Sequence, residues 1–203
     1  MTPEPPRQLD RVTRPLVVLL FFLRGASGLM FETLWMRFLT VTFGATHYAL
    51  ATLLTVFMGG LALGGFLAGR YVDRLRRAPD ALILYGALEL VVGLYGLGLP
   101  WLLDQVHTLH AVIWLRWSPS PYAFALVRFA IVSLALLVPT TAMGATLPAL
   151  SRFWARREHG LGREVGTLYS VNVFGAVTGT FLAGFVLMPA LGISTTNALA
   201  CSV

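Results

Sequence analysis

Lysine is absent from this sequence of 203 residues, cysteine occurs once, and charged residues of all kinds make up only 12%. Soluble domains carry about 25% charged residues, so the composition excludes a soluble globular enzyme and a disordered chain. The single cysteine, Cys201, cannot form an internal disulfide. Because no Cys/His cluster is present, we expect no metal site and no cofactor. Apolar residues are abundant instead, at 57%, as in a polytopic helical membrane protein.

Five apolar stretches are long enough to cross a bilayer, which takes about 20 mostly apolar residues. After an N-terminal tail over 1–14, we expect a transmembrane domain over 15–203. The expected spans are 15–39, 46–70, 81–103, 122–147 and 165–188, with a partial sixth over 193–203. This last segment is too short to cross, so it is either an interfacial tail or, as we favour, the start of a span in a longer protein. The expected fold is an all-α integral membrane bundle of five full transmembrane helices plus a partial sixth.

The placement of arginines predicts the orientation of this bundle. Eleven arginines lie on the N-terminal tail and on the second and fourth connections, against two on the opposite side. Positive residues are retained in the cytoplasm, so we expect a cytoplasmic N-terminus, in a bacterial cytoplasmic (inner) membrane. The first apolar stretch also has features of a signal peptide, but its pattern continues through Trp35, which favours a retained span. The same clusters explain the basic charge, so no nucleic-acid partner is expected.

The third connection, residues 104–121, then faces outward. It is rich in aromatic residues, which suit a membrane interface, and we expect a short helix lying in the membrane surface. His107 and His110 are three residues apart and could share a helix face. They lack a third ligand in the sequence, so solvated histidines are favoured over a metal site.

Three sequence matches recur at an offset of 115 residues and indicate an internal repeat. Arg37-Phe38 recurs as Arg152-Phe153, the tetrapeptide at 66–69 recurs at 181–184, and two glycines of the second span fall on two glycines of the fifth. A repeated unit of three spans must have opposite orientations in its two copies. This predicts the inverted 3+3 arrangement found within each half of a major-facilitator transporter.

Glycines four residues apart line one helix face and let a second helix approach closely. We expect close helix packing at Gly60, Gly64, Gly65, Gly69, Gly175, Gly179 and Gly184. After the second span, Asp73, Arg74 and Arg77 resemble the cytoplasmic loop motif of major-facilitator proteins. A simple positive-inside loop explains the arginines equally well, but not the aspartate.

Four ionisable residues fall inside the expected spans, where a charge costs at least about 2.5–3.5 kcal/mol. A rise of about 1.5 Å per residue places Arg24 and Glu89 at similar depths, and Glu32 and Arg128 together near the outer side. We therefore predict two ion pairs, Arg24 with Glu89 and Glu32 with Arg128. Arg37 is an alternative partner for Glu32. These residues either hold the structure together or bind a solute, and Asn172 can add a hydrogen bond between helices.

Motifs over about residues 24–192 resemble the membrane-embedded N-terminal region of the spermidine synthase-like family, also described as a major-facilitator/spermidine synthase fusion. The motifs are Ser27-Gly28, Glu32, Trp35, Arg37, Phe43-Gly44, Ala68-Gly69-Arg70, Leu88-Glu89-Leu90, Pro139, the run 143–148, the run 168–172, Gly175 and Ala183-Gly184-Phe185. In that family the spans precede a soluble aminopropyltransferase-like domain with a Gly-rich nucleotide loop. No such loop occurs in this sequence.

The resemblance implies a membrane anchor that handles a small cationic solute such as a polyamine. Two other functions stay open: a half-transporter acting as a homodimer, and an accessory subunit of a larger membrane complex. The partners expected in all three cases are the lipid bilayer and other membrane helices. No nucleophile, base and orienting group occur together, so we expect no catalytic residue and no enzyme activity from this chain alone.

Overall fold

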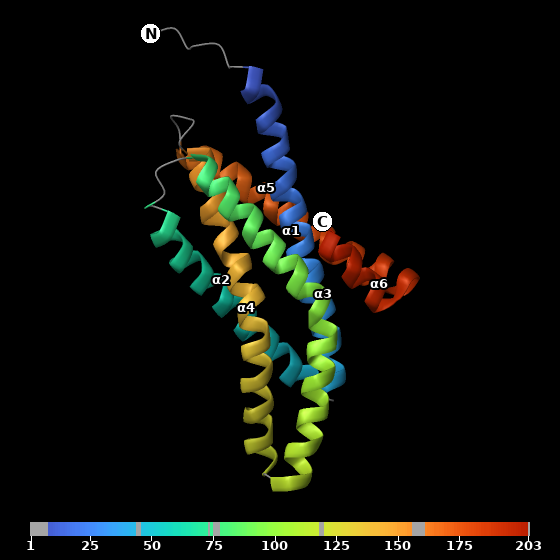
Figure 1. The fold of residues 1–203 in the computed structure, drawn as a ribbon. Helices are drawn as coiled ribbons and strands as arrows, with labels where there is room; N and C mark the ends of the chain where they lie inside the picture. Colours follow the sequence, from blue (N-terminus) through green and yellow to red (C-terminus); the bar gives the residue numbers. More distant parts are fainter. Residues whose placement is uncertain are drawn as a thin grey trace.

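The computed structural model describes residues 8–43, 46–72, 74, 78–117, 120–155 and 161–202, and within them it contains only helices and turns. Figure 1 shows long helices that run roughly along one another. In chain order the elements are α1 (Gln8–Phe43), α2 (Thr46–Val72), α3 (Ala78–Trp117), α4 (Pro121–Ala155), α5 (Leu161–Phe181), a π-helical stretch η1 (Leu182–Leu187) and α6 (Met188–Ser202).

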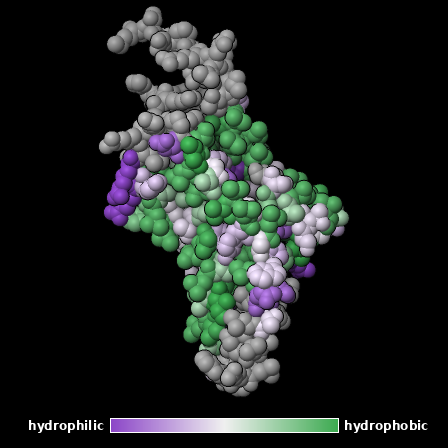
Figure 2. All heavy atoms as spheres, viewed as in Figure 1, coloured by the Kyte–Doolittle hydropathy of each residue, from purple (hydrophilic) through white to green (hydrophobic). Residues whose placement is uncertain are grey.

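Five helical segments are long and apolar enough to cross a membrane. They are Pro15–Thr40, His47–Val72, Asp80–Gln105, Tyr122–Arg152 and Gly166–Ser202. The first four coincide with the predicted spans to within a few residues. Figure 2 shows that apolar side chains cover much of the visible surface of these helices. Apolar helices of this length indicate an integral membrane protein.

The fifth segment joins two stretches that the sequence predicts separately. Between them the helix is interrupted at Gly192, which has φ 79° and ψ 170°. Glycine adopts a positive φ without the steric cost that a Cβ imposes. The break lies one residue before the predicted start of the sixth stretch, and the last residues then pack on α3 and α1, with the C-terminus beside α1 in Figure 1.

The expected short surface helix in the third connection is not a separate element. Helix α3 continues without a break to Trp117. The physical reason is that the run from Asp104 to Trp117 contains neither glycine nor proline, so nothing ends the helix there. Helices α3 and α4 consequently extend as a hairpin well past the other helices (Figure 1). The side chains of His107 and His110 lie outside the described part of the structure.

Two helix pairs form the closest contacts of the bundle, α2 with α4 and α1 with α5. A Cβ at Gly64 would overlap the carbonyl oxygen of Thr141 in α4, and a Cβ at Gly179 would overlap that of Ala26 in α1. The other predicted glycines at such contacts are Gly60, which meets Thr140, and Gly175, which meets Phe22. At Gly64, Gly175 and Gly179 the missing side chain permits the approach of two backbones, and at Gly60 it makes room mainly for the Thr140 side chain.

The remaining predicted glycines behave differently. A Cβ at Gly65 would meet only the Gly144 carbonyl oxygen, at an ordinary 3.8 Å, and nothing lies within 4 Å of one at Gly69 or Gly184. The prediction of close packing is therefore wrong for Gly69 and Gly184. Gly69 of α2 and Gly184 of η1 therefore lie on faces that no neighbouring helix approaches closely. The sequence analysis missed Gly25, where a Cβ would overlap the Asn172 carbonyl oxygen.

Prolines inside the helices leave carbonyl groups without their helical N–H partners, because proline has no N–H to donate four residues on. Pro139 frees the carbonyl of Ala135, and the Tyr95 hydroxyl of α3 donates to it at 2.7 Å. Pro100 frees the carbonyl of Gly96, and the side-chain amide of Asn197 donates to it at 2.9 Å. These bonds tie α3 to α4 and α6 to α3, and they satisfy groups that would otherwise be unpaired in an apolar surrounding.

Candidate functional site

A cavity of about 430 Å³ lies between helices α1, α2, α4 and α5, with Tyr85 of α3 in its wall. This volume is within the usual range of small-molecule pockets, roughly 300–1,000 Å³. Most of the wall is apolar and is contributed by residues such as Phe21, Phe57, Met58, Leu61 and Leu150. The polar side chains on it are few: Arg24, Tyr85, Thr146, Tyr169 and Asn172. An apolar pocket with a small number of polar groups is the usual form of a ligand site.

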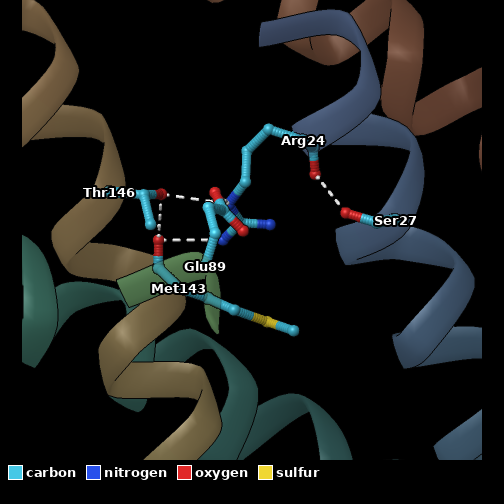
Figure 3. A network of polar contacts seen from close by, with 5 residues as sticks. All are labelled: Arg24, Ser27, Glu89, Met143 and Thr146. Atoms are coloured by element: carbon cyan, nitrogen blue, oxygen red, sulfur yellow. Dashed lines mark hydrogen bonds and ion pairs between the residues drawn. The ribbon is translucent and has the colours of Figure 1, made fainter. Parts of the chain in front are cut away.

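Arg24 reaches from α1 across the bundle to α4 (Figure 3). Its Nε donates to the Thr146 hydroxyl at 3.0 Å, and its Nη2 donates to the Met143 carbonyl at 2.9 Å. The Thr146 hydroxyl itself donates to the same Met143 carbonyl at 2.7 Å. The guanidinium group is thus held in one position by a short segment of α4.

Glu89 of α3 neutralises this arginine. Its Oε1 lies 3.0 Å from Arg24 Nε, and the side chains of Arg24 and Glu89 are only 11% and 29% exposed. The ion pair predicted from the depths of the two residues is therefore formed in the structure. Tyr85 lies one helical turn before Glu89, close to its carboxylate. Together these contacts join α1, α3 and α4 at one level of the bundle, without a net charge.

One nitrogen of the guanidinium group has no partner among the described residues. Nη1 of Arg24 forms no hydrogen bond within the described part of the chain, and it extends over Gly28, where an added Cβ would lie 2.9 Å from it. Gly28 follows Arg24 by four residues, which places it on the same helix face. Both residues line the cavity, and a side chain larger than glycine at position 28 would crowd Nη1.

The cavity also contains a carbonyl group without a helical partner. Pro148 removes the N–H that would bond the Gly144 carbonyl, and both residues line the cavity. No side chain of the described residues donates to Gly144, in contrast to Ala135 and Gly96. The residues that line the cavity therefore include an arginine with an unpaired Nη1 and, beside the Met143 that binds this arginine, a carbonyl that receives no side-chain donor among the described residues.

The second predicted ion pair is wrong. Within the described residues no ion pair joins Glu32 to Arg128 or to Arg37. The Arg128 guanidinium group lies over the Phe124 ring, 4.4 Å from its centroid, and Arg37 is exposed. Glu32 follows Gly25 by seven residues, about two turns, so it shares the face of α1 that packs on α5. Helix α4 packs mainly on α2 and α3, out of reach.

Two further predictions have a partial outcome. Asn172 lines the cavity, as a solute-binding residue would, but its side chain forms no hydrogen bond to another helix among the described residues; its backbone carbonyl contacts Gly25 instead. Of the loop motif, Arg74 is exposed, whereas Asp73 and Arg77 lie outside the described residues. No group of three or more potential metal ligands occurs among the residues that the structure describes.

Sequence reasoning missed Gly28 and Gly144 as cavity residues. The signals were present as spacings: Gly28 follows Arg24 by four residues, and Pro148 follows Gly144 by four. A scan against protein-family models, a search of curated proteins and a search of solved structures give no match to this chain. The function is therefore argued from the geometry of the cavity.

Proposed function

We propose that this chain is a membrane-embedded domain that binds a small, largely apolar solute in the cavity between its helix pairs and supports the passage of that solute. The observation that carries the proposal is the apolar cavity of about 430 Å³ with Arg24 held rigidly in its wall. An arginine that served only to tie helices together needs no space beside it. Here Arg24 Nη1 has no hydrogen-bond partner among the described residues, and Gly28 beside it carries no side chain to fill the adjacent space.

The two closest helix pairs support a transporter-like architecture. Gly64 meets Thr141, and Gly179 meets Ala26. Gly179 follows Gly64 by 115 residues, and Thr141 follows Ala26 by the same 115. The 115-residue offset of the sequence repeat therefore converts the contact between Gly64 and Thr141 into the contact between Gly179 and Ala26. This is what an inverted repeat of three spans requires, with the cavity between the two repeats.

The resemblance to the membrane region of spermidine synthase-like proteins fits this proposal, and so does a bacterial inner-membrane location with a cytoplasmic N-terminus. In this arrangement the chain works beside further membrane helices, in a homodimer, as an accessory subunit of a larger complex, or within a longer protein. The intact mass of the protein from its native membrane, against 22.1 kDa for this chain, distinguishes a longer protein from a stand-alone bundle.

A second candidate function is cation handling, as the polyamine expectation requires. It is favoured by Glu32, a half-buried carboxylate in an apolar helix that forms no ion pair within the described residues. An unpaired acid at such a position is a functional candidate by default. It does not line the cavity, so cation handling would need a separate route along α1.

A cavity-filling substitution tests the main proposal. Gly65→Leu places a side chain into the cavity without a backbone clash, and Gly69→Leu makes the same change one turn further along α2, in open space. We expect mass spectrometry of the protein in lipid nanodiscs to find a small molecule retained from the native membrane. Gly65→Leu should lose it and Gly69→Leu should keep it. Equal retention by both variants, or none by the wild type, would contradict a solute-binding cavity.

A further inference from the structure

Resting on the proposed function, we infer that the cavity takes an uncharged amphiphile whose polar end both accepts and donates a hydrogen bond, a carboxamide being the simplest. The acceptor oxygen of this group lies at Arg24 Nη1 and its donor N–H at the Gly144 carbonyl. The apolar part of the molecule lies along the hydrocarbon wall formed by Phe57, Met58 and Leu61.

The requirement for an acceptor follows from Arg24. Two of its three nitrogens already donate, to Thr146 and to Met143. These bonds fix the plane of the guanidinium group (Figure 3). Nη1, which lies over Gly28, donates to no group of the described residues. A polar donor enclosed in an apolar wall is costly unless an acceptor meets it. A bound molecule with a carbonyl or hydroxyl oxygen supplies that acceptor.

The requirement for a donor follows from a comparison of three prolines. Pro100 and Pro139 each free a carbonyl, and each freed carbonyl receives a side-chain donor from a neighbouring helix. Pro148 frees the carbonyl of Gly144, yet no side chain of the described residues donates to it. This is the freed carbonyl that lines the cavity. A ligand N–H or O–H would take the place that Tyr95 and Asn197 take at the other two.

The absence of net charge follows from Glu89. The carboxylate of Glu89 neutralises Arg24 at 3.0 Å, and among the described residues that line the cavity Arg24 is the one charged side chain. A carboxylate ligand would add an uncompensated negative charge, and an amine would place a positive charge beside the guanidinium group. Both are unfavourable in an apolar surrounding. A neutral group keeps the balance that the pair already provides.

Binding of three probes with the same chain length separates these cases. We would titrate decanamide, decylamine and decanoate onto the protein in nanodiscs of zwitterionic lipid, with Gly65→Leu nanodiscs as the blank for partition into the bilayer. Decanamide should bind at least about tenfold more tightly than either charged probe, as expected for one additional satisfied hydrogen bond and no added charge. Tighter binding of decylamine or decanoate would overturn the inference.

A proline variant tests the carbonyl directly. Pro148→Ala restores the N–H that occupies the Gly144 carbonyl, so it should weaken decanamide binding about three- to tenfold while the affinity for decanoate stays the same. Pro139→Ala is the matched control, because the Ala135 carbonyl already has Tyr95 as its donor, and it should leave both affinities unchanged. Equal decanamide affinity in wild type and Pro148→Ala would overturn the inference.

The two proposals fail in different ways. If all three probes bind Gly65→Leu as well as they bind the wild type, the cavity is not a binding site and the proposed function fails. If Gly65→Leu abolishes binding but an ionised probe is preferred, the cavity is a site and only the uncharged ligand class is wrong.

Discussion

Two arginine–glutamate pairs were predicted inside the membrane spans, and only one of them forms in the described structure. Arg24 and Glu89 form an ion pair at 3.0 Å, buried among α1, α3 and α4. Glu32 and Arg128, predicted by the same reasoning from depth, do not meet, and Arg128 lies over an aromatic ring of its own helix. Equal depth is therefore necessary for a pair but insufficient. What decides is whether the helix faces that carry the two residues are turned toward each other.

The same comparison explains why the cavity lies where it does. Around Arg24, close contacts of α2 with α4 and of α1 with α5 hold the backbones in place, and the guanidinium group bridges the space between the two pairs. Around Glu32 no such bridge exists in the described structure. The Arg24 guanidinium group is already fixed by Thr146, Met143 and Glu89. A ligand that binds its remaining N–H groups therefore does not have to lose free energy in ordering the side chain.

The largest expected effect is the removal of the buried arginine. Arg24→Leu leaves Glu89 without its cation and removes one of the two side-chain donors to the Met143 carbonyl, which should lower the free energy of unfolding by about 3–5 kcal/mol. Unfolding in mixed micelles with increasing SDS measures this. The double variant Arg24→Leu with Glu89→Leu removes both charges and should be more stable than the single variant. A double variant less stable than Arg24→Leu would refute the pairing.

The next effect concerns the backbone contact that holds α4 in place. Gly64→Ala inserts a methyl group against the Thr141 carbonyl and should destabilise the fold by about 1–3 kcal/mol. Gly69→Ala makes the same change in open space, and it should alter stability by less than about 0.5 kcal/mol. The SDS midpoints of the two variants compare them directly. Equal loss in both would mean that α2 and α4 are not in close contact.

A smaller effect is expected at the bond between α3 and α4. Tyr95→Phe removes the hydroxyl that donates to the Ala135 carbonyl at 2.7 Å, without changing the ring. Loss of one hydrogen bond between membrane helices should cost about 1 kcal/mol. In the background Pro139→Ala the freed carbonyl has a helical partner again, so the same change should cost less. An unchanged cost in that background would argue against proline-freed carbonyls as the reason for the contact.

The smallest effect is predicted for Glu32, which forms no ion pair within the described residues. Glu32→Gln should change the free energy of unfolding by less than about 0.5 kcal/mol, since no ion pair is lost within the described structure. Glu89→Gln is the matched substitution in the buried pair and should cost clearly more. Parallel SDS titrations compare the two glutamates. A large loss at Glu32 would show that it has a partner after all, and would remove the contrast between the two sites.

Several features follow from the amino-acid sequence alone. The number and approximate bounds of the apolar helices follow from the lengths of the apolar runs, because a span needs about 20 such residues. The break near residue 193 is visible as a glycine between two apolar stretches, and four of the seven predicted packing glycines lie at close contacts between helices. The Arg24–Glu89 pair was also predictable, because depth along a helix is a one-dimensional property that residue number determines.

Only the tertiary structure decided which helix faces meet. A residue's depth says nothing about the rotation of its helix, so Glu32 and Arg128 were paired wrongly and Gly69 and Gly184 were assigned to contacts that they do not make. The cavity is likewise a property of four helices together, and no single segment encodes it. The unpaired Nη1 of Arg24 and the proline-freed carbonyl of Gly144 acquire a possible role only because the arrangement of α1, α2, α4 and α5 leaves a cavity that both residues line.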